Sequence, residues 1–541
     1  MNCPTRLFAA IDIGSHRLKM KIIEAAPDGR IKDLETVDHL VPLGRDTFNE
    51  GKLSYESVRK TCEAIRGFRR LMADYGVQEW RVVATSAIRE AANRDYMIDR
   101  IKLQTGFDVE IINNSQEKFL TYKAVKWQLE EEGTINTGEP TLILNIGAGN
   151  LLLHLMENSL LTSSQSLKLG ALRIKESIAK IEKHTLNFPR VLEEYIEAHI
   201  ESVEYLKSSN EVRNFVVVSG ELDFLARFAG SHTGKKVVSL NKDLFEGIYS
   251  QAMNKTARAL AEEYDISLTD AELFVPSLIL IRKFLDKTCS DSIIIPVVSL
   301  VDGLIIDKFN CCAGMGFCMD FDADILSCVR KLAARYRSNE KHINYVEGAA
   351  LQIFDRLTGI HGLGVKERFI LQIASILHDT GKFIAADPHC VYSCNIITAS
   401  QILGLSDEEL RMAACIARYH SLESPDPKSA ELAELGTDER LKTMKLIAIV
   451  RMADAMDTSH KQKLKICSID ISEDQFIVRV ESWEEAALEN WTFNMKSEFF
   501  SEVFGLKPQM VIKNRMVGGK LNGTFEDRRV GSETAHGLSQ T

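Results

Sequence analysis

Up to residue 307 the chain alternates between short apolar runs and longer segments with helical periodicity. This alternation of strands and helices predicts an α/β architecture with covered sheets. The helical segments include Ser54–Tyr75 and Ser115–Glu132. The strand-like runs are residues 6–26, Glu79–Ser86, Val109–Asn113, Thr141–Ile146, Leu151–Met156, Asn214–Ser219 and Lys236–Leu240.

Two glycine turns follow apolar strands in this part of the chain, at residues 12–15 (DIGS) and 145–149 (NIGAG). Their spacing indicates that each opens one of two similar lobes of ordinary domain size. Glycine lets a turn adopt positive φ, and successive backbone N–H groups of such a turn can surround phosphate oxygens. Asp12 could hold a Mg²⁺ ion or orient an attacking water. Taken alone, however, residues 12–15 fit an ordinary β-hairpin better than a phosphate site.

The pattern changes in the second half of the chain. Residues 324–459 are almost wholly helix-periodic, short strands return after Lys463, and the last residues are rich in Gly, Ser, Thr and charge. Such a polar end predicts a disordered tail. We therefore expect two lobes at 1–125 and 126–307, a helical domain at 320–462, a small α+β subdomain at 463–515 and a tail at 516–541.

Composition narrows the functional classes. A chain of 541 residues exceeds one hydrophobic core, and its net charge of -10 argues against general binding to nucleic acid or a membrane surface. A local basic cleft remains compatible with that charge. The 11 cysteines form no CxxC pair, which favours reduced thiols. No apolar stretch is long enough to span a bilayer and no signal peptide is evident, so we expect a soluble cytoplasmic protein.

Five segments strengthen the phosphate interpretation when they are read together. In order they are FAAIDIGSHRLKM, VVATSAIREAANR, GFDVEIINNSQEKFLTY, TLILNIGAGNLLLHL and VVVSGELDFLA. In their order, spacing and residues, these segments resemble those of the exopolyphosphatase / guanosine pentaphosphatase (Ppx/GppA) family. The resemblance implies two actin-like lobes of the ribonuclease-H-like (ASKHA) class. It also implies that polyphosphate or the tail of guanosine pentaphosphate binds between them, and that the protein is a homodimer.

The resemblance also assigns roles to residues of the first lobe. It places the first phosphate loop on Asp12, Gly14 and Ser15, with His16 where the family usually has Asn. Arg89 would pair bidentately with a phosphate. Glu117 would be the general base that activates water. Without the resemblance, Glu117 reads as a solvated residue favoured by a helix N-terminus.

The second phosphate loop departs from the family pattern. The resemblance carries over phosphate binding to Gly147, Gly149, Ser219 and Gly220. The two acids that the family has around this loop are replaced by Asn145 and Leu152. Neither side chain brings charge to Mg²⁺ or Mn²⁺, the cofactor that the resemblance implies for the cleft. We therefore expect phosphate binding with weakened metal binding.

A second constellation lies in the helical half. His378 and Asp379 end an apolar helix, His342 opens another, and Asp454 lies inside a third, where a buried carboxylate needs a partner. These four residues would form a divalent-metal site. The order is similar to the HD phosphohydrolase superfamily and to the helical domain of longer Ppx/GppA proteins. Because Tyr392 stands where relatives of this type commonly carry a His, we expect one ion rather than two.

Other features of the helical half leave alternatives open. Relatives commonly carry a His just before a Ser, and this chain has Tyr392 there. His389 lies three residues earlier, and the sequence leaves open whether it replaces the missing histidine. His420 ends a further helix. The alternative to a metal site is a dimerisation domain with a vestigial pocket.

Together these features predict a hydrolase that releases terminal phosphate from polyphosphate or guanosine pentaphosphate through Glu117. One alternative is a regulator that binds polyphosphate or a nucleotide without turnover. The other is a phosphohydrolase that acts through the helical-domain metal site. No membrane or specific nucleic-acid partner is expected.

Overall fold

The computed structural model of the chain describes residues 6–26, 30–134, 138–147, 149–182, 185, 188–200, 212–219, 236–310, 319–400, 402–426 and 428–514. Gly220 and the tail predicted at 516–541 lie outside these residues. In the described ranges, no helix is long and apolar enough to cross a membrane.

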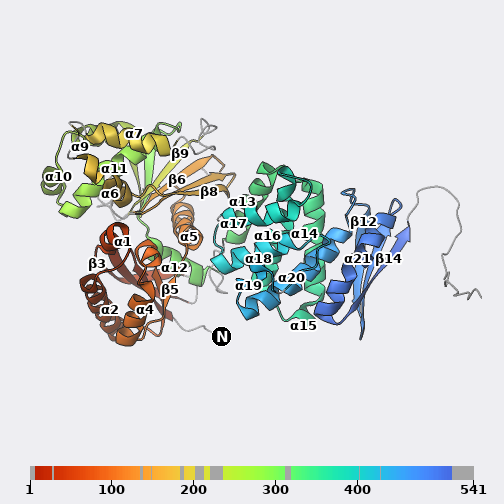
Figure 1. Ribbon diagram of the computed structural model, residues 1–541. Coiled ribbons are helices and arrows are strands. Elements are labelled where there is room, and N and C mark those ends of the chain that lie inside the picture. Colours follow the sequence, from red (N-terminus) through yellow and green to blue (C-terminus); the bar gives the residue numbers. More distant parts are fainter. Residues whose placement is uncertain are drawn as a thin grey trace, which may run out of the picture.

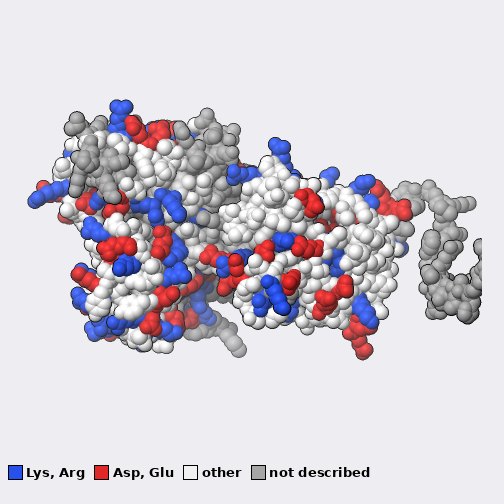
Figure 2. Space-filling view, in the orientation of Figure 1, with Lys and Arg blue, Asp and Glu red and all other residues white. Residues whose placement is uncertain are grey.

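The chain forms two α/β lobes, followed by a helical domain and a small α/β unit. Figure 1 shows the lobes one above the other at the left, with the helical domain and the C-terminal strands extending to the right. Acidic and basic side chains are interspersed over the face shown in Figure 2. Charge on this face is therefore mixed rather than gathered into one large patch.

The first lobe contains a five-stranded sheet with strand order β3-β2-β1-β4-β5. Alternate residues of β1 pack on opposite faces, with Ile11 and Ile13 in one core and Phe8 and Ala10 in another. Both faces of this sheet are therefore covered. The strands are β1 (Arg6–Ile13), β2 (Arg17–Ala25), β3 (Ile31–Leu40), β4 (Glu79–Ala84) and β5 (Val109–Ile111). The helices are α1 (Leu43–Glu50), α2 (Tyr55–Tyr75), α3 (Ser86–Glu90) and α4 (Arg94–Thr105).

The second lobe contains a six-stranded sheet with strand order β10-β11-β9-β6-β7-β8. It opens like the first lobe: β6 pairs antiparallel with β7 and parallel with β9, as β1 does with β2 and β4. The strands are β6 (Thr141–Ile146), β7 (Leu151–Glu157), β8 (Leu160–Leu167), β9 (Asn214–Val218), β10 (Val237–Asn241) and β11 (Ser292–Pro296). The helices on one face are α6 (Ala171–Glu182), α7 (Phe188–Ile200), α9 (Lys242–Ala252), α10 (Ala257–Tyr264) and α11 (Leu268–Leu285).

Two helices, α5 (Asn114–Glu132) and α12 (Leu300–Phe309), lie where the lobes meet the helical domain (Figure 1). A capping box between Asn113 and Gln116 begins α5. The two helices approach so closely that a Cβ placed on Gly303 would lie 2.1 Å from the carbonyl oxygen of Leu120. Only glycine at this position permits that approach.

The helical domain is tied to the second lobe by a buried carboxylate. Asp324, in the first helix of the domain, accepts a hydrogen bond from Lys126 of α5 at 2.8 Å and from the backbone of Leu161 in β8 at 3.0 Å. Its side chain is fully buried. Because the partners come from α5 and β8, this carboxylate joins three parts of the chain.

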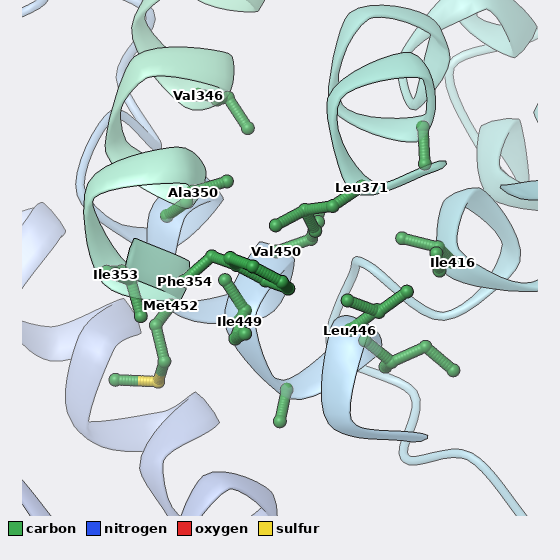
Figure 3. Packing of buried hydrophobic residues seen from close by; sticks show 14 of the residues in the cluster. Val346, Ala350, Ile353, Phe354, Leu371, Ile416, Leu446, Ile449, Val450 and Met452 are labelled. Atoms are coloured by element: carbon green, nitrogen blue, oxygen red, sulfur yellow. The ribbon is translucent and has the colours of Figure 1, made fainter. Parts of the chain in front are cut away.

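One hydrophobic core fills the helical domain and continues into the C-terminal sheet. Figure 3 shows Phe354, Leu371, Leu446 and Val450 pointing into the shared space. The helices are α13 (Phe321–Arg335), α14 (Glu340–Arg356), α15 (Thr358–His361), α16 (Val365–Leu377), η4 (Thr380–Phe383), α17 (His389–Ala399), α18 (Asp407–Arg418), α19 (Ala430–Ala433) and α20 (Thr437–Ala455). The C-terminal unit contains β12 (Leu464–Ile471), β13 (Gln475–Ser482), α21 (Ala487–Phe504) and β14 (Lys507–Asn514).

The close crossing of α5 and α12 generates a stability prediction. Gly303→Ala should lower the free energy of unfolding by about 2–3 kcal/mol, because backbone rather than a flexible side chain blocks the added methyl group. Gly348→Ala is the matched control, since its added Cβ would meet nothing within 4 Å on α14. It should be neutral or stabilising by up to about 1 kcal/mol. Urea unfolding of both variants checks this, and equal effects would contradict the packing argument.

Candidate functional site

A cavity of about 210 Å³ lies between the two lobes. The equivalent hairpin turns of the two sheets line it from opposite sides. Gly14 N–H donates to the Arg17 carbonyl at 3.0 Å, and Gly147 N–H donates to the Asn150 carbonyl at 2.9 Å. A Cβ on Gly14 would lie 2.8 Å from that Arg17 oxygen, so this turn requires glycine. The structure therefore brings Asp12, Gly14, Ser15, Glu117, Gly147 and Gly149 into one cavity.

Asp12 lies at the end of β1 with one carboxylate oxygen buried and without a hydrogen-bond partner among the described residues. Burial, and next the negative charge of Glu117, raise the pKa of Asp12 to about 8. An unsatisfied buried carboxylate beside a second carboxylate is the donor set that a divalent cation prefers. The residues present therefore fit a Mg²⁺ or Mn²⁺ ion held by Asp12.

Glu117 lies in the first turn of α5 and lines the cavity. Arg89 donates to Glu117 Oε2 at 3.2 Å and to the Ile112 carbonyl at 2.7 Å. Arg89 is not among the residues that line the cavity. In this structure it orients the predicted base, whereas the sequence predicted that it holds phosphate.

Ser15 is engaged with the first lobe. Its hydroxyl lies 2.7 Å from Ser86 Oγ and accepts a hydrogen bond from the backbone of Ala87 at 3.2 Å. It therefore anchors the start of α3 to the first turn. Ser219 directly follows β9, whose last residue, Val218, lines the cavity.

The two departures in the second loop lie side by side. Asn145 and Leu152 are directly paired between β6 and β7, and both line the cavity. Leu152 is 5% exposed and offers no ligand atom. The second lobe thus contributes backbone groups and the amides of Asn145 and Asn150 to this wall, while Asp12, Asp38 and Glu117 bring carboxylates to the cavity.

Two ionic contacts hold the lobes together around the cavity. Asp270 of α11 lies 3.2 Å from His16 Nε2 and accepts from Arg17 at 2.8 Å. Although burial opposes it, these hydrogen bonds keep the pKa of Asp270 well below its usual range. On the opposite side, Arg173 donates to the Gly149 carbonyl at 2.8 Å and pairs with Glu90 at 3.1 Å. His16, which departs from the family pattern, therefore has a structural contact in this chain.

The helical domain contains a second cluster of titratable side chains. The predicted residues His342, His378, Asp379 and Asp454 come from α14, the end of α16 and α20. His342 Nε2 lies 3.2 Å from His378 Nε2, 3.4 Å from Asp454 Oδ1 and 3.6 Å from Asp379 Oδ2. His342, His378 and Asp454 lie close enough to bind a common ion, and Asp379 forms two further groups of this kind, one with His342 and His460 and one with His378 and His420.

Three further imidazoles complete the cluster around Asp379. His389 Nε2 and His420 Nε2 lie 3.5 and 3.7 Å from Asp379 Oδ1, and His460 Nε2 lies 3.9 Å from its Oδ2. The sequence left His389 open and noted His420 only as a helix end. His460 comes after α20 with positive φ, and no spacing in the sequence pointed to it.

Hydrogen bonds to the backbone orient the imidazoles. The Nδ1 atoms of His378, His389 and His420 lie 2.8, 3.0 and 2.7 Å from carbonyl oxygens, so they carry the protons. Nε2 of each ring is therefore left as a lone pair that faces the cluster. Carbonyl contacts of this kind are typical of metal-ligating histidines. His342 makes the equivalent Nδ1 contact to Asp457 Oδ2 at 2.8 Å.

Two lysines pair with the acids of the cluster. Lys382 donates to Asp379 at 2.6 Å, and Lys496, from α21, donates to Asp454 at 2.5 Å. Although burial opposes it, neighbouring imidazoles and lysines keep the pKa of both carboxyls low. Burial lowers the pKa of His420 to about 3, so this ring stays neutral and able to bind a metal.

The loop that carries His420 is fixed by a buried arginine. Arg451 of α20 donates to the carbonyl oxygens of Tyr419, Ser421 and Glu423. On the opposite wall, a Cβ on Gly381 would lie 1.9 Å from the His389 carbonyl oxygen. Backbone packing therefore sets the position of both imidazoles.

Comparison with known proteins identifies the family. The model of the Ppx/GppA phosphatase family matches residues 22–310, and that of Ppx/GppA phosphatase, domain III, matches residues 326–497. A guanosine-5'-triphosphate,3'-diphosphate pyrophosphatase of Aliivibrio fischeri is 21% identical over 86% of this chain and 92% of its own length. A bifunctional 3-dehydroquinate synthase/phosphatase of Fusobacterium nucleatum is 23% identical over 56% of this chain, which spans only 46% of that protein.

A solved structure agrees with the fold. The crystal structure of an exopolyphosphatase from Cytophaga hutchinsonii is similar over 56% of this chain and 98% of that chain, with a TM-score of 0.51 and 20% identity. The likeness confirms the predicted fold class. The chain belongs to the Ppx/GppA phosphatase family.

Proposed function

We propose that this chain hydrolyses phosphoanhydrides in the interlobe cleft and releases terminal phosphate from polyphosphate or guanosine pentaphosphate. The observation that carries the proposal is the pair of carboxylates, Asp12 and Glu117, that face each other between two glycine turns. The printed names of the relatives, a pyrophosphatase and an exopolyphosphatase, support this reaction class.

The proposed reaction divides the work between the two carboxylates. Glu117 takes a proton from a water molecule, whose oxygen attacks the terminal phosphorus. The bond from that phosphorus to the bridging oxygen breaks, which yields orthophosphate and a chain one phosphate shorter. Backbone N–H groups of the two turns hold the phosphate oxygens, and Arg89 orients Glu117. When bound at Asp12, Mg²⁺ or Mn²⁺ supplies positive charge against the phosphate oxygens.

A second candidate function is metal-dependent phosphohydrolysis in the helical domain. Among the described residues, seven donor side chains converge there, and two of the three groups that could hold an ion share Asp379. This sharing favours two ions, with Asp379 among the residues that would hold each of them, over the single ion expected from the sequence. A two-ion site can generate hydroxide and stabilise both oxygens of a phosphoryl transfer.

Substitution of Glu117 distinguishes the cleft from the helical-domain site. Glu117→Gln should reduce phosphate release from polyphosphate by at least about 100-fold, because it removes the base and keeps the shape. Glu132→Gln, at the exposed end of the same helix, is the control and should match the wild type. Malachite-green phosphate release in Mg²⁺ measures both.

Two other outcomes would redirect the assignment. Loss of release in His378→Ala and Asp379→Ala, with Glu117→Gln unaffected, would place the reaction in the helical domain. Tight binding of polyphosphate by the wild type without release would identify a regulator that does not hydrolyse its ligand.

The unsatisfied carboxylate of Asp12 predicts a pH-dependent stability. Its pKa rises from 3.8 to about 8 on folding, so stability is lost as pH increases between these values, where only the unfolded chain gives up the proton. In EDTA at pH 8, Asp12→Asn should therefore be more stable than the wild type, by on the order of 2 kcal/mol. Thermal unfolding should show this gain disappear near pH 4, and a gain that persists at pH 4 would contradict its origin in ionisation.

The helical-domain cluster predicts a metal content. Inductively coupled plasma mass spectrometry on the dialysed wild type should find about two divalent ions per chain. Asp379→Ala should lose both ions, whereas His420→Ala should lose one. His199→Ala, an exposed histidine in the second lobe, should retain both. One ion in the wild type would restore the mononuclear assignment, and none would favour the vestigial pocket.

A further inference from the structure

A second, larger cavity lies outside both sites, between the edge of the second sheet and the helical domain. Its volume is about 800 Å³. We call it the β8 pocket, because Thr162–Ser166 of the edge strand β8 form one wall. Another wall is formed by α13, through Cys328, Val329, Lys331, Leu332 and Arg335, and by the following Tyr336, and Lys118 of α5 also lines the pocket.

The charges that line the β8 pocket are all positive. Lys118, Lys331 and Arg335 line it, and no carboxylate stands among its described lining residues. Lys331 also pairs with Glu157 at 3.4 Å, but more than half of its side chain is exposed. In a chain of net charge -10 this is a local exception, and it favours an anionic ligand.

The strand wall offers hydroxyl and amide groups. The consecutive residues Ser163, Ser164, Gln165 and Ser166 line the pocket. β8 is the outermost strand of its sheet, so one side of its backbone has no neighbouring strand in that sheet. Hydroxyl and backbone N–H groups beside ammonium and guanidinium groups are the usual partners of phosphate oxygens.

Buried polar groups behind this wall lack partners. Ser164 Oγ is buried without a hydrogen bond, and neither ring nitrogen of His154 has one among the described residues. His154 is 1% exposed and lies directly opposite Ser164 on β7. Each unsatisfied buried group costs about 1–3 kcal/mol, a cost that a bound ligand can offset.

Lys118 connects this buried region to the pocket. It is 1% exposed, and burial lowers its pKa to about 8. Burial, and next the positive charge of Lys118, lower the pKa of His154 to about 3, and both side chains are 1% exposed. Lys118 immediately follows Glu117, so the first turn of α5 has the proposed base in the cleft on one side and this lysine in the β8 pocket on the other.

We propose that the β8 pocket binds a phosphorylated anion, with Lys118, Lys331, Arg335 and the serines of β8 holding its phosphate groups. The volume admits an oligophosphate with or without a nucleoside, and Leu332 and Tyr336 provide an apolar wall for a base. This site is separate from the interlobe cleft, so the proposal stands whether or not the cleft hydrolyses its ligand.

Hydrogen–deuterium exchange tests the site with tripolyphosphate, GTP and guanosine as probes. The full-length Glu117→Gln protein is used so that turnover does not consume the probes. Tripolyphosphate or GTP should slow exchange in the peptide that contains residues 160–167, and uncharged guanosine should not. Protection by both anions would identify the phosphate chain as the ligand group, whereas protection by GTP alone would identify a nucleoside polyphosphate.

Charge variants complete the test. When Lys331→Ala and Arg335→Ala are added to the Glu117→Gln protein, binding of tripolyphosphate at residues 160–167 should weaken by at least 10-fold. Protection of the cleft turns should stay unchanged. Both residues are on the exposed side of α13, so the fold should persist. Lys465→Ala with Lys507→Ala removes the same charge from the C-terminal sheet and should have no effect. Protection confined to residues 12–17 and 147–150, or unchanged binding by the α13 variant, would overturn the proposal.

Discussion

The close contact of α5 with α12 is the constraint on which both lobes depend. Because Gly303 has no side chain, the helix backbones meet at Leu120, and this fixes the rotation of α5. That rotation directs Glu117 into the cleft and Lys118 into the β8 pocket. Farther along the same helix, Lys126 meets the buried Asp324 and ties the helical domain to the second lobe. A single helix therefore sets the geometry of the cleft, the pocket and the domain junction.

The two candidate sites solve the problem of buried charge differently. In the cleft, Asp12 has no cationic hydrogen-bond partner and its pKa is raised, so without a cation its charged form is costly. In the helical domain, Lys382 and Lys496 pair with Asp379 and Asp454, and the pKa values of both carboxyls are lowered, although Asp379 Oδ1 is also buried without a hydrogen-bond partner among the described residues. Both sites thus leave a buried carboxylate oxygen that a cation could bind, but only in the helical cluster are the acids also paired with lysines.

Much of the site could be read from the sequence because its residues lie in local patterns. Asp12 and Gly14 follow a strand, and His378 and Asp379 are adjacent at a helix end. Patterns of this kind can be recognised in the sequence, because they involve residues that are close together in the chain. Arg89 shows the limit: its type fitted a phosphate ligand, which stays a prediction, and its contacts with Glu117 and the Ile112 carbonyl could not be read from the sequence. The sequence analysis missed His460, because it lies far from Asp379 along the chain and no periodic pattern links the two residues.

The sequence by itself determined the α/β lobes, the helical second half and the two glycine turns, because strand alternation, helical periodicity and close backbone turns depend on neighbouring residues. Only the tertiary structure decided which charges meet. It paired His16 with Asp270 across the lobes, gathered His389, His420 and His460 around Asp379, and left Ser164 and His154 unsatisfied behind the β8 pocket. These contacts join residues far apart in the chain, and packing of whole helices and sheets brings them within reach.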